Sequence, residues 1–350
     1  MAAQFMDTES PIFILGTERS GSNLLRLILN SHSNITVPHP PHIVHYFKHL
    51  EPYYGDPRED KNFQRLIDDI LGLLDVHIYP WDISPERNTI LREARPRDAF
   101  GVMIALYEQY RRHTGKARWG CKSTFMIHHV PAILKRFPQA RLILLVRDPR
   151  DVAASSRQSV FSPYHPLLTA RLWASQQHIG MKWHQKLPSS SLHVLFYEDL
   201  TTMPERALER LCGFLDEPFE KDMLNFFHTR EARKSGRLSE SWKATASPVS
   251  TKSLRRFEEE LTRDELLNVE SSCLEAMRYF GYSPRIDPEE LKHHRPSLGD
   301  GIRARLLDDY WRLKVEMRSW RRDRNAGRRW ARALYLRKVA LVLKHGPRRL

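Results

Sequence analysis

Short apolar runs and amphipathic segments alternate along residues 11–215 of the chain. The runs at 12–15, 141–147 and 192–197 have the pattern of strands buried on both faces of a parallel sheet, and 117–121 is a shorter candidate. Apolar residues recur at helical spacing in the intervening segments, at 23–32, 63–74, 98–113, 127–137 and 204–214. Strands alternating with helices predict an α/β fold, a P-loop-type, doubly wound, mostly parallel sheet flanked by helices.

The pattern changes near residue 282. Residues 283–301 are rich in proline and charged side chains, which is typical of a linker, and a helical pattern rich in arginine follows. We therefore expect an α/β domain at 1–282, a linker at 283–301 and a basic amphipathic helical tail at 302–350.

The formal net charge of +14 is concentrated in this tail. Residues 301–350 hold sixteen Lys and Arg against four acidic residues, so the first 300 residues are nearly neutral. Arginines beside Trp311, Trp320, Trp330 and an apolar run at 339–343 suit an anionic membrane surface. A solvated helix packed on the core fits the same pattern. No motif supports nucleic-acid binding, which we do not expect.

The remaining composition fits a cytoplasmic globular protein. No apolar stretch approaches the roughly 18 residues of a membrane-spanning helix, and the start of the chain lacks the pattern of a signal peptide. Cys121, Cys212 and Cys273 are far apart in the sequence, so we expect reduced core thiols and neither a disulfide nor a zinc site. We expect no metal.

The sequence GTERSGSN, residues 16–23, lies between the first predicted strand and helix. Its glycines have the spacing of a phosphate-binding loop, but Ser22 and Asn23 stand where such loops carry lysine and a magnesium-binding hydroxyl. Backbone N–H groups and the helix N-terminus can still bind an anion, and Arg19 adds a planar donor. A tight turn with a solvated arginine is the alternative.

A second candidate anion site follows the strand at 141–147. Arg147 stands at the strand end and Ser155 lies eight residues later, within the predicted helix. Ligands of doubly wound sheets bind beyond the C-terminal strand ends, where both segments lie. Two anion sites on adjacent strand ends suit a nucleotide with phosphates at two positions.

These stretches resemble the sulfotransferases that use 3′-phosphoadenosine 5′-phosphosulfate (PAPS), above all the bacterial branch and the tyrosylprotein sulfotransferases. The matching segments are PIFILGTERSGSNLLRLIL, WGCKST, LILLVRDPRDVAASS, FYEDL and the segment from Ser250 to Tyr282, over roughly 11–282. The resemblance implies PAPS as sulfuryl donor, adenosine 3′,5′-bisphosphate (PAP) as product and no metal, which would explain the missing lysine and hydroxyl of the loop.

The resemblance also assigns roles to residues. The 5′-phosphate site would comprise Arg19, Ser20, Gly21, Ser22 and Asn23. Arg147 and Ser155 would hold the 3′-phosphate, Tyr197 would contact the adenine, and Lys122 would contact the sulfuryl group. Further candidate 3′-phosphate ligands are Lys252, Arg255 and Arg256.

The general base is predicted from the segment after the first helix, where relatives often carry a glutamate. This chain has no acid there and offers His39, His42 and His45. The ordinary pKa of histidine suits a base at neutral pH, and we rank His42 and His39 above His45. The alternatives are His128 or His129, a carboxylate from the middle helices, or proton transfer to solvent for an acidic acceptor.

The sequence thus predicts an enzyme that transfers a sulfuryl group from PAPS to a hydroxyl or amine of a small-molecule, lipid or saccharide acceptor. The acceptor site is expected around 39–110 and 160–185. A P-loop kinase or NTPase is one alternative, and a nucleotide-binding, membrane-associated protein without catalysis is another.

Overall fold

The computed structural model describes residues 10–345, so the ends of the predicted domain at 1–9 and of the predicted tail at 346–350 lie outside the described residues. A five-stranded parallel sheet lies at the centre, in the order β2-β3-β1-β4-β5. The strands are β1 (Ile12–Gly16), β2 (Ile35–Thr36), β3 (Arg118–Lys122), β4 (Arg141–Val146) and β5 (Leu192–Phe196). The predicted strands are all present, and β2 is an addition.

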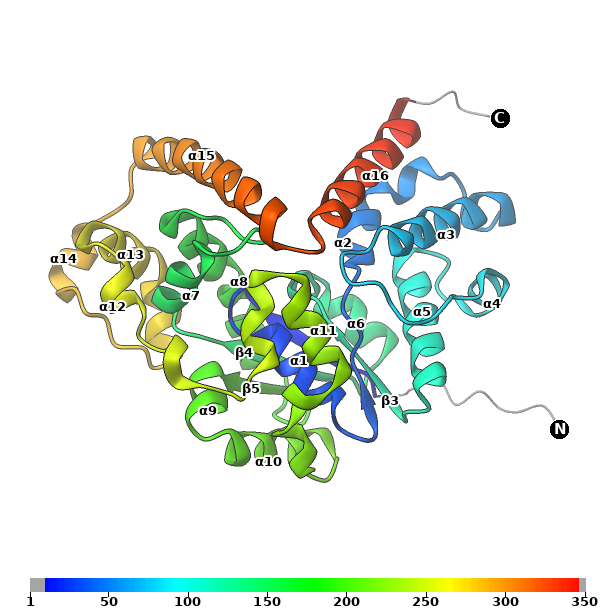
Figure 1. Ribbon diagram of the computed structural model, residues 1–350, viewed down its shortest axis with the longest axis horizontal. Helices are drawn as coiled ribbons and strands as arrows, with labels where there is room; N and C mark the ends of the chain where they lie inside the picture. The colour runs from blue at the N-terminus through cyan, green and yellow to red at the C-terminus, as the bar shows by residue number, and fades with distance from the viewer. Residues whose placement is uncertain (1–9, 346–350) are drawn as a thin grey trace.

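Helices cover both faces of the sheet, because the central strands are apolar on both sides. Along β1, Phe13 and Leu15 belong to one hydrophobic cluster, whereas Ile12 and Ile14 belong to the other. One face packs on α1 (Ser22–Asn30), α10 (Pro204–Leu215) and α11 (Arg230–Leu238). The predicted doubly wound α/β fold is confirmed (Figure 1).

The opposite face carries most of the remaining helices. They are α2 (Ile43–Phe47), α3 (Asp60–Asp75), α5 (Ala99–Thr114), α6 (Val130–Arg136), α7 (Pro149–Ser156), α8 (Pro166–Lys186) and α13 (Arg263–Tyr279). Shorter helices are α4 (Arg87–Glu93), α9 (Tyr197–Thr202) and α12 (Phe257–Glu260). The helix predicted at 127–137 is divided, since a 3-10 turn at Thr124–His129 precedes α6, whose first turn contains Pro131. Cys121, Cys212 and Cys273 are buried and carry free thiols.

The C-terminal helices rest on the α/β domain. The segment predicted as a linker contains α14 (Pro288–His293) and the start of α15 (Leu298–Arg322), and α16 (Ala326–His345) follows. The carboxylate of Asp308 in α15 accepts the backbone N–H groups of Tyr164 and His165, at 2.6 and 2.8 Å. The predicted tail is therefore helical and packed on the core, across the top of the molecule in Figure 1. Within residues 10–345, the helices are all too short or too polar to cross a bilayer.

Candidate functional site

The two predicted anion-binding segments meet where the winding of the sheet reverses. The chain leaves β1 toward β2 and β3 on one side, and it leaves β4 toward β5 on the other. Because β1 and β4 are neighbours, with Gly16 paired to Leu145, their C-terminal ends open side by side. Such a point is where doubly wound sheets bind ligands.

The loop after β1 has a backbone that depends on its glycines. A side chain on Gly16 would meet the carbonyl oxygen of Leu145 at 2.5 Å, and one on Gly21 would meet the ring of Tyr197 at 2.4 Å. Gly21 (φ 91°) and Arg19 (φ 69°) are left-handed, which turns the chain sharply into α1. The first backbone N–H groups of α1, from Ser22 and Asn23, are thereby free to bind an anion beyond the sheet.

The side chains of the loop divide into two groups. The hydroxyl of Ser20 is buried and has no hydrogen-bond partner among the described residues, so it retains capacity for a ligand. Asn23 instead uses its amide within the fold, donating to Ser235 at 3.2 Å and accepting from Arg26 at 2.9 Å. Any contact of Asn23 with an anion is therefore expected to use its backbone.

Arg19, Arg147 and Ser155 lie together. Nε and Nη2 of Arg19 both donate to Oγ of Ser155, each at 3.2 Å, and Nη1 of Arg147 donates to the carbonyl oxygen of Arg19 at 2.8 Å. Burial, with Arg147 nearby, lowers the pKa of Arg19 to about 10. Two guanidinium groups so close repel each other, and a bound anion would relieve that repulsion.

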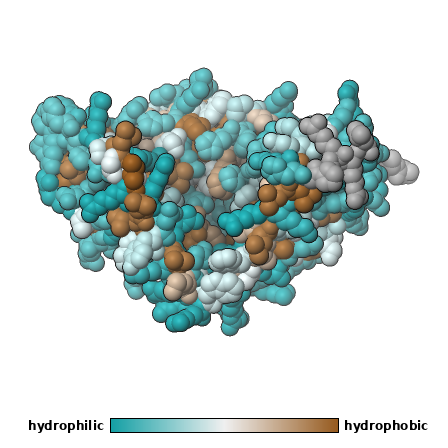
Figure 2. All heavy atoms as spheres, turned by 90° about the horizontal axis from the view of Figure 1, so that it is seen from above, coloured by the Kyte–Doolittle hydropathy of each residue, from teal (hydrophilic) through white to brown (hydrophobic). Residues whose placement is uncertain are grey.

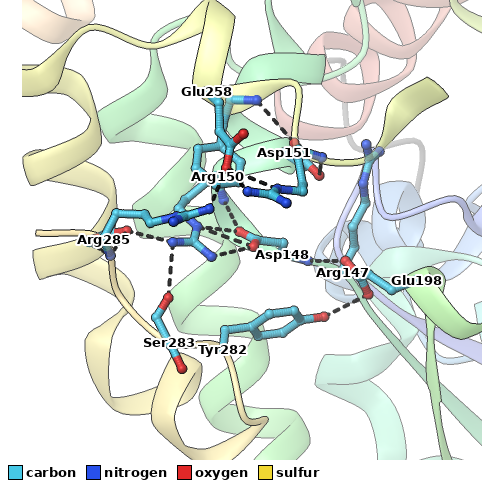
Figure 3. Close-up of polar contacts among 12 residues, drawn as sticks. Arg147, Asp148, Arg150, Asp151, Glu198, Glu258, Tyr282, Ser283 and Arg285 are labelled. Carbon is cyan, nitrogen blue, oxygen red and sulfur yellow. Dashed lines mark hydrogen bonds and ion pairs between the residues drawn. The ribbon is translucent and has the colours of Figure 1, made fainter. Parts of the chain in front are cut away.

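Within residues 10–345, the charge of Arg147 is not neutralised by a hydrogen-bonded carboxylate, whereas that of the nearby Arg150 is. Arg150 pairs with Asp148 at 2.7 Å and with Glu270 at 2.8 Å, both buried. Arg147 donates to two neutral carbonyl oxygens, of Arg19 and of Ser253, and its buried Nε has no partner among the described residues. Figure 3 shows Arg147 extended away from the cluster around Arg150. Arg150 therefore stabilises the fold, and Arg147 offers an anion-binding group.

The segment 250–257 closes over the loop. Asp151 in α7 accepts the backbone N–H groups of Arg255 and Phe257, at 2.8 and 3.2 Å. Tyr197 lies beneath the guanidinium of Arg147, 4.4 Å from ring centre to Cζ, and its hydroxyl lies 2.7 Å from Oγ of Ser253. Neither Asp151 nor Ser253 was predictable as a site residue, because each contacts residues that are distant in the chain.

The three basic candidates of this segment lie farther out. Lys252 and Arg255 are exposed, and Arg255 pairs with Glu258 at 2.7 Å. Arg256 pairs with Glu260 but lies near enough to Arg19 to contribute to the lowering of its pKa. Among the three, Arg256 therefore has the placement closest to that predicted.

Lys122 ends β3 and lies on the same edge of the sheet as the loop, since Ile14 of β1 pairs with it. Burial and the charge of Arg26 lower the pKa of Lys122 to about 8. Arg19 contributes in the same direction, while Glu18 opposes it. Lys122 is thus a charged group within electrostatic reach of the loop.

His42 lies beside Lys122. Its Nδ1 is 2.8 Å from Oγ of Ser123, the residue after Lys122. Burial, and then the charge of Lys122, hold the pKa of His42 well below its ordinary value, so the ring is neutral near pH 7 and able to accept a proton. His45 is exposed and stacks on Phe125 at 3.6 Å. His42 therefore lies in the environment expected of a general base, whereas His45 lies at the surface.

His39 is enclosed by aromatic rings. It stacks on Tyr79 at 5.2 Å and lies 4.9 Å from the ring of Trp242. Burial and the neighbouring His77 keep its pKa well below the ordinary value. Its buried Nδ1 has no partner among the described residues. Because Trp242 follows Ser241, whose carbonyl oxygen accepts from Arg19 at 3.4 Å, His39 lies at the edge of the same site.

Glu18 is a carboxylate of the loop that the sequence interpretation overlooked. Burial raises its pKa to about 7, although Lys122 and Arg19 oppose the shift. It directly precedes Arg19, and no sequence pattern distinguishes its side chain. A carboxyl group with this pKa can exchange a proton near neutral pH. Within residues 10–345, no group of three or more His, Cys, Asp or Glu is arranged to hold a metal ion.

Comparison with known proteins agrees with this geometry. A protein-family model described as "Sulfotransferase family" matches residues 11–221. An uncharacterized protein of Aquifex aeolicus is 26% identical over 81% of this chain, although the match spans 36% of that protein's length. Protein-tyrosine sulfotransferase A of Caenorhabditis elegans is 21% identical, over 79% of this chain and 68% of its own. The sulfotransferase domain of the Synechococcus PCC 7002 olefin synthase has a TM-score of 0.55 at 20% identity, covering 78% of this chain and 95% of that one, and shows the same fold.

Proposed function

Because the chain belongs to the sulfotransferase family, we propose that it transfers a sulfuryl group from PAPS to a hydroxyl or amine of an acceptor. The observation that carries the proposal is the junction of Arg19, Arg147 and Ser155 at adjacent strand ends. It joins two anion-binding segments into one site, as a nucleotide with phosphates at two positions requires. Calorimetry with PAP, followed by a screen of acceptors with labelled PAPS, tests it.

The residues fit such a nucleotide. We assign the 5′-phosphate to the backbone N–H groups of the loop, with Ser20 and Arg19, because the buried hydroxyl of Ser20 has no partner within residues 10–345. Arg147 and Ser155 are assigned to the 3′-phosphate, since the Nε of Arg147 likewise has no partner in the part of the chain that the structure describes. Tyr197 is assigned to the adenine.

The bound nucleotide supplies a sulfuryl group and a phosphate leaving group. In an in-line displacement, the acceptor oxygen or nitrogen forms its bond to sulfur as the bond from sulfur to the phosphate oxygen breaks, and the bonding electrons leave with that oxygen. Lys122 and Arg19 balance the charge that develops there. The neutral ring of His42 takes the acceptor's proton.

The acceptor and location are also parts of the proposal. We assign catalysis to residues 1–282 and expect a small-molecule, lipid or saccharide acceptor in the cytoplasm, with contact to an anionic membrane through the C-terminal helices. The support for the acceptor position is that the two segments expected to form it meet beside His39: Tyr79 stacks on His39, and Trp242 lies against both His39 and Phe161.

Arg147→Ala and Ser155→Ala are each expected to weaken PAP binding, measured by calorimetry. Loss of a charge-assisted phosphate contact costs about 1.5–3 kcal/mol, or roughly 10–150-fold in Kd. Ser156→Ala is the matched control, because the Ser156 hydroxyl donates to the carbonyl oxygen of Ala153 inside the fold. Unchanged affinity in both Arg147→Ala and Ser155→Ala would remove the 3′-phosphate assignment.

Turnover of PAPS is expected to continue in EDTA, because positive side chains of the protein, rather than a magnesium ion held by a hydroxyl at position 23, would balance the charge of the leaving phosphate. A kinase or NTPase would instead consume ATP and lose activity when magnesium is removed. A non-catalytic nucleotide-binding protein would bind PAP and transfer label to none of a broad set of acceptors.

A further inference from the structure

Most of the large apolar side chains of helix α15 are exposed, whereas a helix that only packs on a core would bury them. Gly301, Ala304, Asp308 and Ser319 are buried against the domain. With 3.6 residues per turn, the roughly opposite side of the helix carries an exposed apolar stripe. The stripe consists of Ile302, Leu306, Tyr310, Leu313, Met317 and Trp320, and Leu306, Leu313 and Met317 each expose more than 60% of their surface.

The stripe continues onto α16. The rings of Trp320 and Trp330 are 6.0 Å apart across the junction of the two helices, and Leu334, Leu341 and Val342 are exposed beyond Trp330. Figure 2, viewed from above the two helices, shows apolar side chains grouped over α15 and over α16. We call this set of exposed apolar residues on α15 and α16 the outer face.

The outer face is held rigidly. Arg329 is buried at the junction, 2.9 Å from Asp323, whose carboxylate also accepts the backbone N–H of Glu240 at 2.9 Å. In α16, the hydroxyl of Tyr335 donates to the carbonyl oxygen of Asp69 at 2.9 Å, and Val339 is buried. Turning the apolar residues inward would break these buried contacts, so their exposure is a fixed property of the fold.

Basic residues flank the stripe of α15 on one side, where Arg303, Lys314 and Arg321 follow one another by helical position, whereas the other side carries Arg305 together with Asp309 and Glu316. A second copy packed antiparallel on this stripe would place the two basic flanks opposite one another. An anionic bilayer complements the basic flank while the apolar residues enter the headgroup boundary. We propose that the outer face docks on an anionic lipid bilayer, with α15 and α16 lying in its surface.

Docking in this orientation brings the membrane surface close to the candidate site, with the α15–α16 junction between them. The α15–α16 junction covers the aromatic residues around His39, since Asn325 donates to the carbonyl oxygen of Ile78 at 3.4 Å and its N–H donates to that of Leu238 at 3.3 Å. Arg312 of α15 and Arg332 of α16 are both near enough to Glu18 to influence its pKa. Resting on the proposed sulfuryl transfer, this placement favours a lipid headgroup as the acceptor.

Co-sedimentation with vesicles tests the docking. The full chain is expected to bind phosphatidylcholine vesicles that contain 30% phosphatidylserine, to bind pure phosphatidylcholine at least tenfold more weakly, and to be released by salt. The triple variant Leu306→Ser/Leu313→Ser/Met317→Ser should reduce binding at least tenfold, and Arg303→Gln/Arg305→Gln/Lys314→Gln should reduce it selectively for anionic vesicles. Deletion of the helices is a poorer test, because it removes the buried contacts of Asp308 and Asp323.

Met203→Ser is the control, since Met203 is 44% exposed and directly follows α9, a helix that lies on the opposite side of the molecule from α15 and α16 in Figure 1. It should bind vesicles normally, and every variant should keep its PAP affinity. The docking proposal is wrong if the triple serine variant binds vesicles as well as the parent protein does. It is also wrong if the parent protein does not bind vesicles and instead forms a dimer that the triple serine variant cannot form. The measurement of PAP affinity distinguishes two kinds of failure. A protein that binds PAP but not vesicles contradicts only the docking, whereas a protein that does not bind PAP contradicts the proposed function. The acceptor class is tested by incubating the protein and labelled PAPS with vesicles made from a polar lipid extract. Transfer of label to the lipid fraction would support a lipid headgroup as the acceptor, and no transfer would contradict it.

Discussion

Replacement of Lys122 by methionine is expected to lower the turnover of PAPS about 10²–10³-fold, the usual effect of removing one preorganised group that stabilises developing charge. PAP affinity should fall much less, because the charge of Lys122 matters most as the leaving oxygen becomes negative. Single-turnover kinetics and calorimetry measure the two effects. Arg19→Asn, which keeps a residue that tolerates the left-handed backbone at this position (φ 69°), should show the same division between turnover and affinity.

The Lys122→Met variant should fold as stably as the parent protein, so a loss of turnover would not reflect unfolding. The pKa of Lys122 is about 8 in the folded protein against 10.5 for an ordinary lysine, so between these pH values the unfolded chain binds more protons and stability rises with pH. The charged lysine therefore opposes folding, and methionine should not lower the melting temperature.

Lys116 provides the contrast to Lys122. It precedes the same strand at its other end, and its Nζ donates to the carbonyl oxygens of Asn30, His32 and Ile35. Lys116→Met should reduce stability while leaving kcat unchanged. A loss of PAP affinity in Lys122→Met that equals the loss of turnover would mean that Lys122 binds the nucleotide in the ground state.

Much of the fold was predictable because it depends on local patterns. An apolar run such as 141–147 fits the buried interior of a parallel sheet, and Gly16 followed by an amphipathic segment indicated the turn into α1. Helix α8 was overlooked because it is buried on several sides: Trp173, Gln176, Gln177 and Met181 are all buried, so polar and apolar residues are mixed along its buried surface. Periodicity alone does not reveal such a helix.

The site was predictable in part for a different reason. Arg19, Arg147 and Ser155 stand at fixed positions relative to strand ends, so strand adjacency alone brings them together. Residues that depend on long-range closure were not predictable. Asp151 contacts the backbone of Arg255, 104 residues away in the chain, and Ser253 contacts Tyr197, 56 residues away. Likewise, no sequence pattern showed that α15 would turn its apolar stripe outward.

His42→Asn is expected to lower turnover about 10²–10⁴-fold, the span for loss of a general base, while PAP still binds. Asparagine is the appropriate replacement because His42 has a left-handed backbone (φ 57°), which asparagine tolerates better than alanine. His45→Asn, three residues later, is the control, since His45 is exposed, and it should retain near-normal turnover.

The pH dependence of kcat/KM identifies the base, because it reports the pKa values of the free enzyme. The groups that act on His42 are Lys122, Arg332, His77 and His45, and burial together with them lowers its pKa. If His42 is the base, activity rises with pH through a pKa below 6.5 and falls above about 8, as Lys122 loses its proton. If Glu18 is the base, the rise is centred near 7 instead. Near-normal turnover in His42→Asn together with a large loss in Glu18→Gln would then assign the acceptor's proton to the carboxylate of the loop.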